Sequence, residues 1–229
     1  MKILIQGATP DEIDIFLDYF KPEKKTSIVS YEFYETTYKN HEIIISETQK
    51  GIINATIATT IALSNFKPDV VINQGCAGAH VEDLKVGDIV IGDKSNYIND
   101  FKTPIKPAGA GSNSLEWTPH KNRSYSTPST KELVEKAQQV NSSYKTVVGT
   151  LGSADTFSRE IDRINFLHSK FNHLCEDMES AATMLTCERF NTKHICFRVI
   201  SNNELTLLPF DESTRQPMQR FVIDFINIL

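Results

Sequence analysis

Several short, nearly continuous runs of apolar residues constrain the fold of this chain more than any other feature. They occupy residues 2–6, 69–73 (DVVIN), 88–92 (DIVIG), 147–151 and 194–200 (HICFRVI). Runs that are too short for a helix and apolar at consecutive positions are typical of strands covered on both faces. We therefore expect these runs to form the centre of a sheet with helices on both sides.

Stretches with helical periodicity lie between the predicted strands. The spacing of apolar residues predicts helices over 11–20, 51–66, 130–140 and 179–190. The clearest pattern is at the C-terminus, where one apolar helix face carries Met218, Phe221, Val222, Phe225, Ile226 and Leu229. Strands that alternate with helices in this way predict an α/β fold.

Two further strands are expected at 26–33 and 42–46, before the second helix. One stretch, residues 96–130, breaks the alternation because it is rich in Pro, Gly, Ser, Asn and Lys. It contains the single tryptophan, Trp117. A long irregular segment inside a compact domain is typically a lid, an interface segment or a surface loop, and we expect a lid or an oligomer contact here.

Composition excludes several classes of protein. The net charge is −5 and no basic stripe is present, so we do not expect a nucleic-acid partner. No apolar run reaches the roughly 20 residues that a membrane span needs, and the N-terminus does not read as a signal peptide. The four cysteines form no CxxC pair and lie among apolar residues, which is typical of free thiols in a reducing compartment. We therefore expect a cytoplasmic protein.

Three polar segments follow predicted strands and are candidates for a site. They are residues 74–79 (QGCAGA), 176–180 (EDMES) and 198–203 (RVISNN). Ligands bind at the carboxyl ends of strands in open α/β sheets, where small residues let a ligand approach the backbone. Each segment taken alone also fits ordinary turn or helix-start chemistry.

Together, these segments resemble the nucleoside phosphorylase superfamily. The combination of KPDVVINQGCAGAHVEDLKVGDIVIGD with DMESAA is most similar to the 5′-methylthioadenosine/S-adenosylhomocysteine nucleosidases, and the similarity extends over nearly the whole chain. The resemblance implies one domain, residues 1–229, built as a three-layer sandwich whose central mixed sheet is flanked by helices. It also implies a small purine nucleoside as the partner, no cofactor or metal, and a homodimer in which the partner closes the 5′ pocket. Residues 96–130 and 205–210 are candidates for that contact.

The resemblance implies a role for each matching residue at the sugar. Glu12 matches the glutamate that binds and activates the attacking water as a general base. Glu179 matches the glutamate that accepts hydrogen bonds from the ribose hydroxyls and places negative charge beside an oxocarbenium-like sugar. Met178 matches the residue that packs on the sugar. Asp177 stands where the nucleosidases often have glutamate and is expected to contact the ribose or the base, with a shorter arm. Arg198 is expected to orient its neighbours.

Other matches concern the base and the 5′ group. Phe157 matches the aromatic residue that stacks on the purine, and Ser201 and Asn202 match the pair at its N7 edge. Lys50 stands where the nucleosidases usually have an apolar residue near the 5′ group, so it either signals a charged 5′ substituent or faces solvent. Three residues are expected to line the ribose and base side: Cys76, Ala77 and Gly78.

Asn202 departs from the pattern of the adenine-specific nucleosidases, which have aspartic acid there. An amide cannot give a proton to N7, although it can donate a hydrogen bond to N7 or O6 and accept one through its carbonyl. Asparagine at this position is seen in members that act on 6-oxopurines. A 6-oxopurine nucleosidase similar to futalosine hydrolases and a non-catalytic nucleoside-binding protein are therefore both alternatives. Glu204 is a further candidate for the missing acid, and His80 is a candidate ligand contact.

The residues after the glycine-rich turn favour hydrolysis over phosphorolysis. They include no arginine where purine nucleoside phosphorylases of the superfamily carry one to hold the phosphate dianion. We predict a purine nucleosidase that hydrolyses the N-glycosidic bond, with Glu12, Glu179 and Asn202 as catalytic residues. A purine nucleoside phosphorylase whose phosphate ligands lie elsewhere is the alternative.

Overall fold

The computed structural model describes residues 1–120 and 125–229. Its strands are β1 (Lys2–Gly7), β2 (Lys24–Ile28), β3 (Tyr31–Tyr38), β4 (His41–Glu47), β5 (Val70–Ala79), β6 (Ile89–Tyr97), β7 (Phe101–Lys102), β8 (Thr118–Pro119), β9 (Ser126–Pro128), β10 (Thr146–Ser153), β11 (Cys175–Asp177) and β12 (Lys193–Asn203). Its α-helices are α1 (Asp14–Phe20), α2 (Ile52–Phe66), α3 (Lys131–Ala137), α4 (Ile161–Phe171), α5 (Ser180–Arg189) and α6 (Arg215–Asn227).

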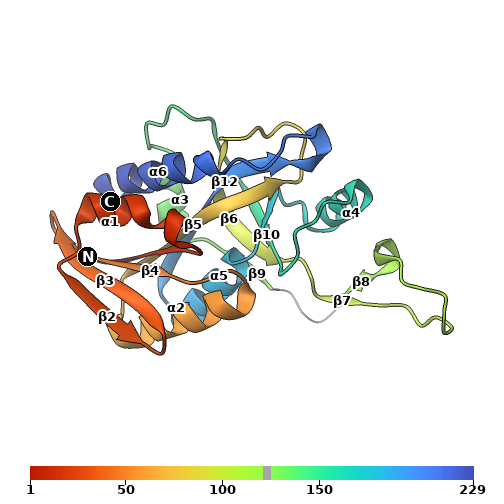
Figure 1. The fold of residues 1–229 in the computed structure, drawn as a ribbon, viewed down its shortest axis with the longest axis horizontal. Coiled ribbons are helices and arrows are strands. Elements are labelled where there is room, and N and C mark those ends of the chain that lie inside the picture. The colour runs from red at the N-terminus through yellow and green to blue at the C-terminus, as the bar shows by residue number, and fades with distance from the viewer. Residues whose placement is uncertain (121–124) are drawn as a thin grey trace.

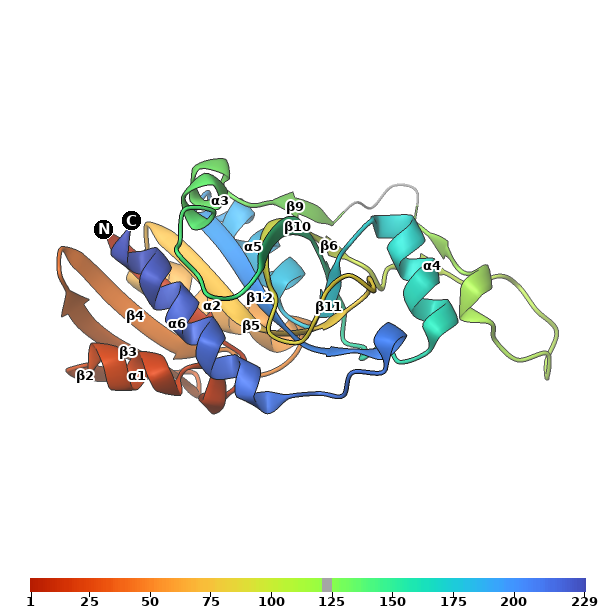
Figure 2. The same cartoon turned by 90° about the horizontal axis from the view of Figure 1, so that it is seen from above.

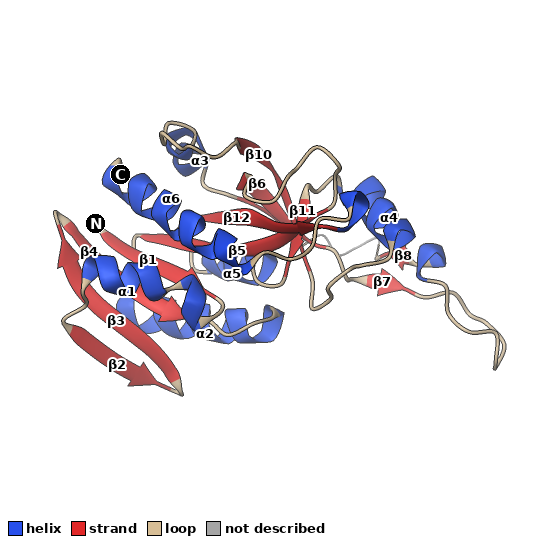
Figure 3. Cartoon of the chain, turned by 45° about the horizontal axis from the view of Figure 1, so that its top comes forward, coloured by secondary structure: helices blue, strands red, loops and turns tan. Residues whose placement is uncertain are grey.

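A mixed sheet of ten strands forms the centre of the molecule, in the order β11-β10-β6-β12-β5-β1-β4-β3-β2, with β9 on β6 (Figure 3). The predicted strands β1, β5 and β12 lie side by side and are parallel. The pairing between β12 and β6 is antiparallel. At one end, β11 pairs with both β10 and β5, so this part of the sheet closes on itself.

Helices cover both faces of the sheet, as the apolar strands predict (Figure 2). Ile3 and Ile5 of β1 belong to a core cluster that includes buried residues of α1, α3 and α6. Leu4, which points to the opposite face, belongs to a second cluster that includes residues of α2. The α/β class and the flanked mixed sheet are therefore confirmed.

Element boundaries differ from the prediction in several places. Strands β5 and β6 continue past their predicted ends at 73 and 92, so residues 74–79, expected to follow a strand, belong to β5. The predicted single strand at 26–33 is a hairpin between β2 and β3, because the chain turns at Val29 and Ser30, both of which have positive φ. The predicted helix at 11–20 starts with a 3-10 turn, Pro10–Glu12, before α1 begins. Helix α4 and strand β11 were not predicted. Strand β11 has only three residues, which is too short to show a periodic pattern.

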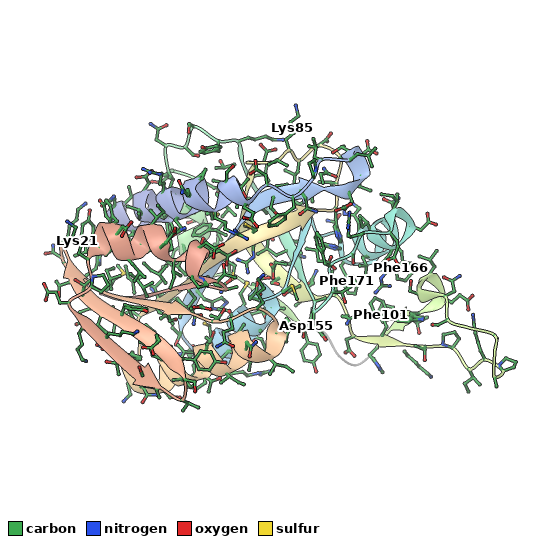
Figure 4. The ribbon with its side chains drawn as sticks, in the orientation of Figure 1. Lys21, Lys85, Phe101, Asp155, Phe166 and Phe171 are labelled. Atoms are coloured by element: carbon green, nitrogen blue, oxygen red, sulfur yellow. The ribbon has the colours of Figure 1, made fainter. Side chains whose placement is uncertain are left out.

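The irregular segment predicted at 96–130 is partly regular. Strand β6 continues to Tyr97, and β7 and β8 then form a small two-stranded sheet in an arm that extends away from the body (Figure 1). At the base of this arm, Phe101 packs against Phe166 and Phe171 (Figure 4). Residues 121–124 lie outside the described residues.

None of the described helices has the length and apolar character that crossing a membrane requires.

Candidate active site

A cavity of about 280 Å³ lies where β5, β11 and β12 end, beside the turn that follows β1. All three predicted catalytic residues and all eight predicted substrate-binding residues line it. Sequence reasoning did not assign six further lining residues: Ala8, Thr9, Thr156, Glu176, Phe210 and Arg215. The residues singled out from the sequence therefore lie together in the wall of one cavity.

Glu12 is held in the cavity wall by two backbone groups. Its side chain is buried in the 3-10 turn that follows β1. Oε2 accepts a hydrogen bond from Ala8 N at 2.7 Å, and Oε1 accepts one from Cys76 N at 3.1 Å. A Cβ atom on Gly75 would lie 3.0 Å from Glu12 Oε1, so glycine allows this close approach. The result is a fixed carboxylate that can act as a general base.

Arg198 is a fully buried cation on β12 between two carboxylates of the site. Its Nε lies 3.1 Å from Asp177 Oδ2, and Nη2 lies 3.9 Å from Glu179 Oε2. Nη2 also donates to Asn73 Oδ1 at 2.7 Å. Burial alone would lower the pKa of Arg198, but the adjacent carboxylates outweigh it and raise that pKa. Arg198 therefore orients its neighbours, as predicted.

Asp177 serves as a structural acceptor at the start of α5. Its Oδ1 accepts hydrogen bonds from Ser153 Oγ, Glu179 N and Ser180 N, each at 2.8 Å. A carboxylate suits this position because the first N–H groups of a helix have no partner within it. The Asp177 carboxylate is thus engaged by partners within the protein. Its contact with ribose or base stays a prediction.

Glu179 lies directly before α5 and faces the cavity beside Met178. Oε1 accepts a hydrogen bond from Gly51 N at 2.9 Å. Burial raises the pKa of Glu179 to about 7, although the positive charge of Arg198 opposes this shift. The Glu179 carboxyl consequently titrates near neutral pH.

Ser201 and Asn202, in the last part of β12, line the same cavity as Glu176. Ser201 Oγ lies 3.2 Å from Ala77 O and 3.1 Å from Asn202 Oδ1. Asn202 Nδ2 donates to Glu204 Oε1 at 3.3 Å, so the candidate replacement acid contacts the amide instead of lining the cavity. His80 is also not a lining residue and packs behind Glu176, which it approaches to 3.5 Å.

Exposed residues surround the mouth of the cavity. Lys50 is exposed just before α2, and the Phe157 side chain is half exposed. Phe210 and Arg215 come from the segment before α6 and from its first turn, and the Arg215 guanidinium lies over the Phe210 ring at 5.7 Å. No local motif marks Arg215, because only the packing of α6 brings it to the site, whereas Phe210 lies in the segment 205–210 that was expected near the 5′ pocket. None of the described residues 98–120 and 125–130 lines this cavity.

Comparisons with known proteins agree with this architecture. The chain belongs to the phosphorylase superfamily, whose family profile matches residues 2–227. It is 31% identical over 201 residues to 5′-methylthioadenosine/S-adenosylhomocysteine nucleosidase of Staphylococcus aureus, covering 86% of this chain and 85% of that protein.

Solved structures show the same fold. The native futalosine hydrolase of Helicobacter pylori matches with a TM-score of 0.83 and 24% identity, over 100% of this chain and 98% of that one. The Streptococcus pneumoniae MTA/SAH nucleosidase in complex with 8-aminoadenine matches with a TM-score of 0.82 and 23% identity, over 100% of both chains.

The buried ion group around Arg198 generates a stability prediction. Arg198→Met should lower the free energy of unfolding by about 3–5 kcal/mol, because Asp177 and Glu179 would be left buried without their cation. Urea denaturation at about pH 8, where Glu179 is ionised, measures this loss. Arg220→Met, at an exposed position of α6, is the matched control and should change stability by less than about 0.5 kcal/mol. A loss below about 1 kcal/mol for Arg198→Met would contradict the assignment.

Proposed function

We propose that this chain is a purine nucleosidase, an enzyme that hydrolyses the bond between a purine base and ribose. The observation that carries the proposal is one cavity lined by two buried carboxylates, Glu12 and Glu179, and by a buried amide, Asn202. Relatives that share this architecture include nucleosidases by name. The arrangement provides a base for water, an acceptor for sugar hydroxyls and a polar contact for the leaving purine.

Each group has a defined part in the proposed step. The water oxygen bonds to C1′ of the ribose while the bond from C1′ to N9 breaks and its electron pair moves into the purine. Glu12 takes the proton from the water, which its fixed position favours. Glu179 accepts hydrogen bonds from the ribose hydroxyls and stabilises the positive charge that develops on the sugar. Asn202 stabilises the leaving purine as a hydrogen-bond donor and not as an acid, so the purine leaves as an anion that takes a proton from solvent, and Glu12 returns its proton to solvent.

The small number of cationic residues available to bind a phosphate dianion favours water over phosphate as the nucleophile. Among the described lining residues, these are Lys50 and Arg215. Arg215 is already paired, since its Nη1 lies 2.6 Å from Asp11 Oδ2. Lys50 is exposed at the mouth, where its ammonium could pair with a negatively charged 5′ substituent. A phosphate dianion beside Glu12 would instead meet a carboxylate of like charge.

We further propose a homodimer that forms through the face of α2. Ile53 and Ile57 are 69% and 41% exposed on this helix, which is unusual for isoleucines one turn apart. A shallow apolar cavity of about 260 Å³ adjoins them between α2 and α5, and it is lined in part by Tyr97 and Tyr125 at the base of the arm. A second copy packed on this face would cover the isoleucines.

A cytoplasmic location is also a proposal. It is supported by the four cysteines, which are all free thiols, three of them buried.

Hydrolysis predicts release of a purine base from a nucleoside in phosphate-free buffer. Chromatography of incubations with methylthioadenosine, S-adenosylhomocysteine, adenosine, inosine, guanosine and futalosine detects the product. Glu12→Gln should lower kcat/KM by at least about 100-fold because it removes the general base. Glu23→Gln, an exposed glutamate, is the control and should match the unaltered enzyme. Cleavage that depends on phosphate would establish a phosphorylase, and binding without any cleavage would establish a binding protein.

The titration of Glu179 predicts a pH dependence. Its pKa of about 7 in the free enzyme means that the carboxylate is progressively protonated below that pH. A protonated carboxyl accepts less well from the ribose hydroxyls, so kcat/KM should fall as the pH drops through about 7, approaching tenfold per pH unit. Initial rates at constant ionic strength measure the profile. A value of kcat/KM that stays constant down to about pH 5 would exclude this role for Glu179.

The dimer proposal predicts that a charge on α2 separates the copies. Ile57→Asp should elute as a monomer in size-exclusion chromatography with light scattering, because burying an unpaired carboxylate in an interface is unfavourable. Ile228→Asp, also at an exposed isoleucine, should leave the dimer intact. Unaltered protein that is monomeric, or Ile57→Asp protein that stays dimeric, would refute the proposed interface.

A further inference from the structure

Glu176 is a buried carboxylate in the cavity wall that the proposed reaction does not use. Its Oε2 accepts a hydrogen bond from Ser158 N at 2.8 Å, and its Oε1 accepts one from Ser158 Oγ at 3.0 Å. His80 Nε2 lies 3.5 Å from Oε2 on the other side. These contacts hold the carboxylate in place and leave lone pairs on both oxygens for a ligand.

The strand register places Glu176 and Asn202 on either side of a glycine. Glu176 on β11 pairs with Gly78 on β5, and Gly78 pairs with Asn202 on β12. Residues paired across neighbouring strands point to the same face of a sheet. Gly78 has no side chain, and a Cβ there would lie only 3.2 Å from Asn202 Nδ2. The glycine therefore forms a flat floor between an acidic and an amide group.

The amide of Asn202 has a defined orientation. Its Nδ2 donates to Glu204 Oε1 at 3.3 Å, and Glu204 is itself paired with Arg159, whose Nε lies 3.4 Å away. An ionised carboxylate only accepts hydrogen bonds, so it selects the amide nitrogen and not the amide oxygen as its neighbour. The second N–H of Asn202 is then available to an acceptor on the ligand.

Two histidines packed behind Glu176 direct an N–H donor toward its carboxylate. His80 Nδ1 lies 2.7 Å from His173 Nε2. Burial holds the pKa of His173 well below its usual value, so this ring is neutral. A neutral His173 that donates from Nε2 leaves His80 Nδ1 as acceptor and directs the Nε2–H of His80 toward Glu176. Both neighbours of the carboxylate, Ser158 and His80, therefore present donors to it.

We infer that Glu176 is a specificity-determining residue that accepts a hydrogen bond from N1–H of a 6-oxopurine while Asn202 donates to O6 or N7. In 6-oxopurines N1 carries a hydrogen and lies next to the O6 acceptor, so the donor and acceptor match the carboxylate and the amide. In 6-aminopurines N1 carries a lone pair, which would face the lone pairs of Glu176. The inference rests on the proposed function, because it assigns the substrate class of the same site.

Binding of free bases tests the inference without requiring turnover. Isothermal titration calorimetry should show that the unaltered protein binds hypoxanthine at least about tenfold more tightly than adenine. Glu176→Gln should weaken hypoxanthine binding by about 10–100-fold, the usual effect of losing a hydrogen bond to a charged group. Adenine binding should be unchanged or stronger, because the new amide can donate to N1.

Two further variants separate recognition from structure. Glu176→Asp keeps the acceptor and should retain the preference for hypoxanthine even if both bases bind more weakly. Glu188→Gln, at an exposed glutamate of α5, is the matched control and should behave as the unaltered protein does. A loss of folding would weaken both bases alike, whereas loss of recognition changes their ratio.

The outcomes distinguish this inference from the proposed function. A preference for adenine, an unchanged ratio in Glu176→Gln, or binding of neither base would overturn the role of Glu176. If the preference and its loss are observed but neither inosine nor adenosine is cleaved, base recognition stands and the proposed nucleosidase activity fails. If cleavage occurs with adenosine preferred in every variant, the activity stands and the inference fails.

Discussion

The buried ion group of Arg198, Asp177 and Glu179 is the interaction on which the rest of the site depends. Arg198 lies on β12, Asp177 on β11 and Glu179 at the start of α5, so one guanidinium joins three elements. Buried charges are tolerated only when they are paired and hydrogen-bonded, and here each carboxylate also accepts backbone N–H groups. The same pairing that stabilises the fold therefore also fixes the position of Glu179 in the cavity wall, and it opposes the rise in the pKa of Glu179 that burial causes.

Local pattern predicted the sheet and most of the cavity wall, for a physical reason. Buried strands require apolar runs, and the site residues occur in sequence close after such runs: Glu12 after β1, Cys76 in the last part of β5 and Asn202 in the last part of β12. Glu12, Cys76 and Asn202 could therefore be located without knowledge of distant contacts. Their resemblance to a known family then indicated which of them face a nucleoside.

The sequence was less informative where position depends on distant packing. Arg215 reaches the cavity only because α6 packs across the sheet, and no local signal marks it. Phe210 lies in the segment 205–210, which was expected at a partner contact beside the 5′ pocket, and it lines the cavity of its own chain. Glu176 was visible as part of an acidic cluster, but its value comes from pairing with Gly78, a partner almost one hundred residues earlier. The hairpin of β2 and β3 was missed because its turn uses Val29 and Ser30 in place of glycine.

The double pairing of β11 has a mechanical consequence. Because β11 bonds to β10 on one side and to β5 on the other, this part of the sheet is a closed ring without a free edge. In a ring, a strand cannot shift its register without disturbing every neighbour in turn. The part of the cavity wall that β5, β11 and β12 form should therefore be rigid. Adaptation to differently sized substrates is then left to the exposed residues at the mouth, such as Phe157 and Phe210.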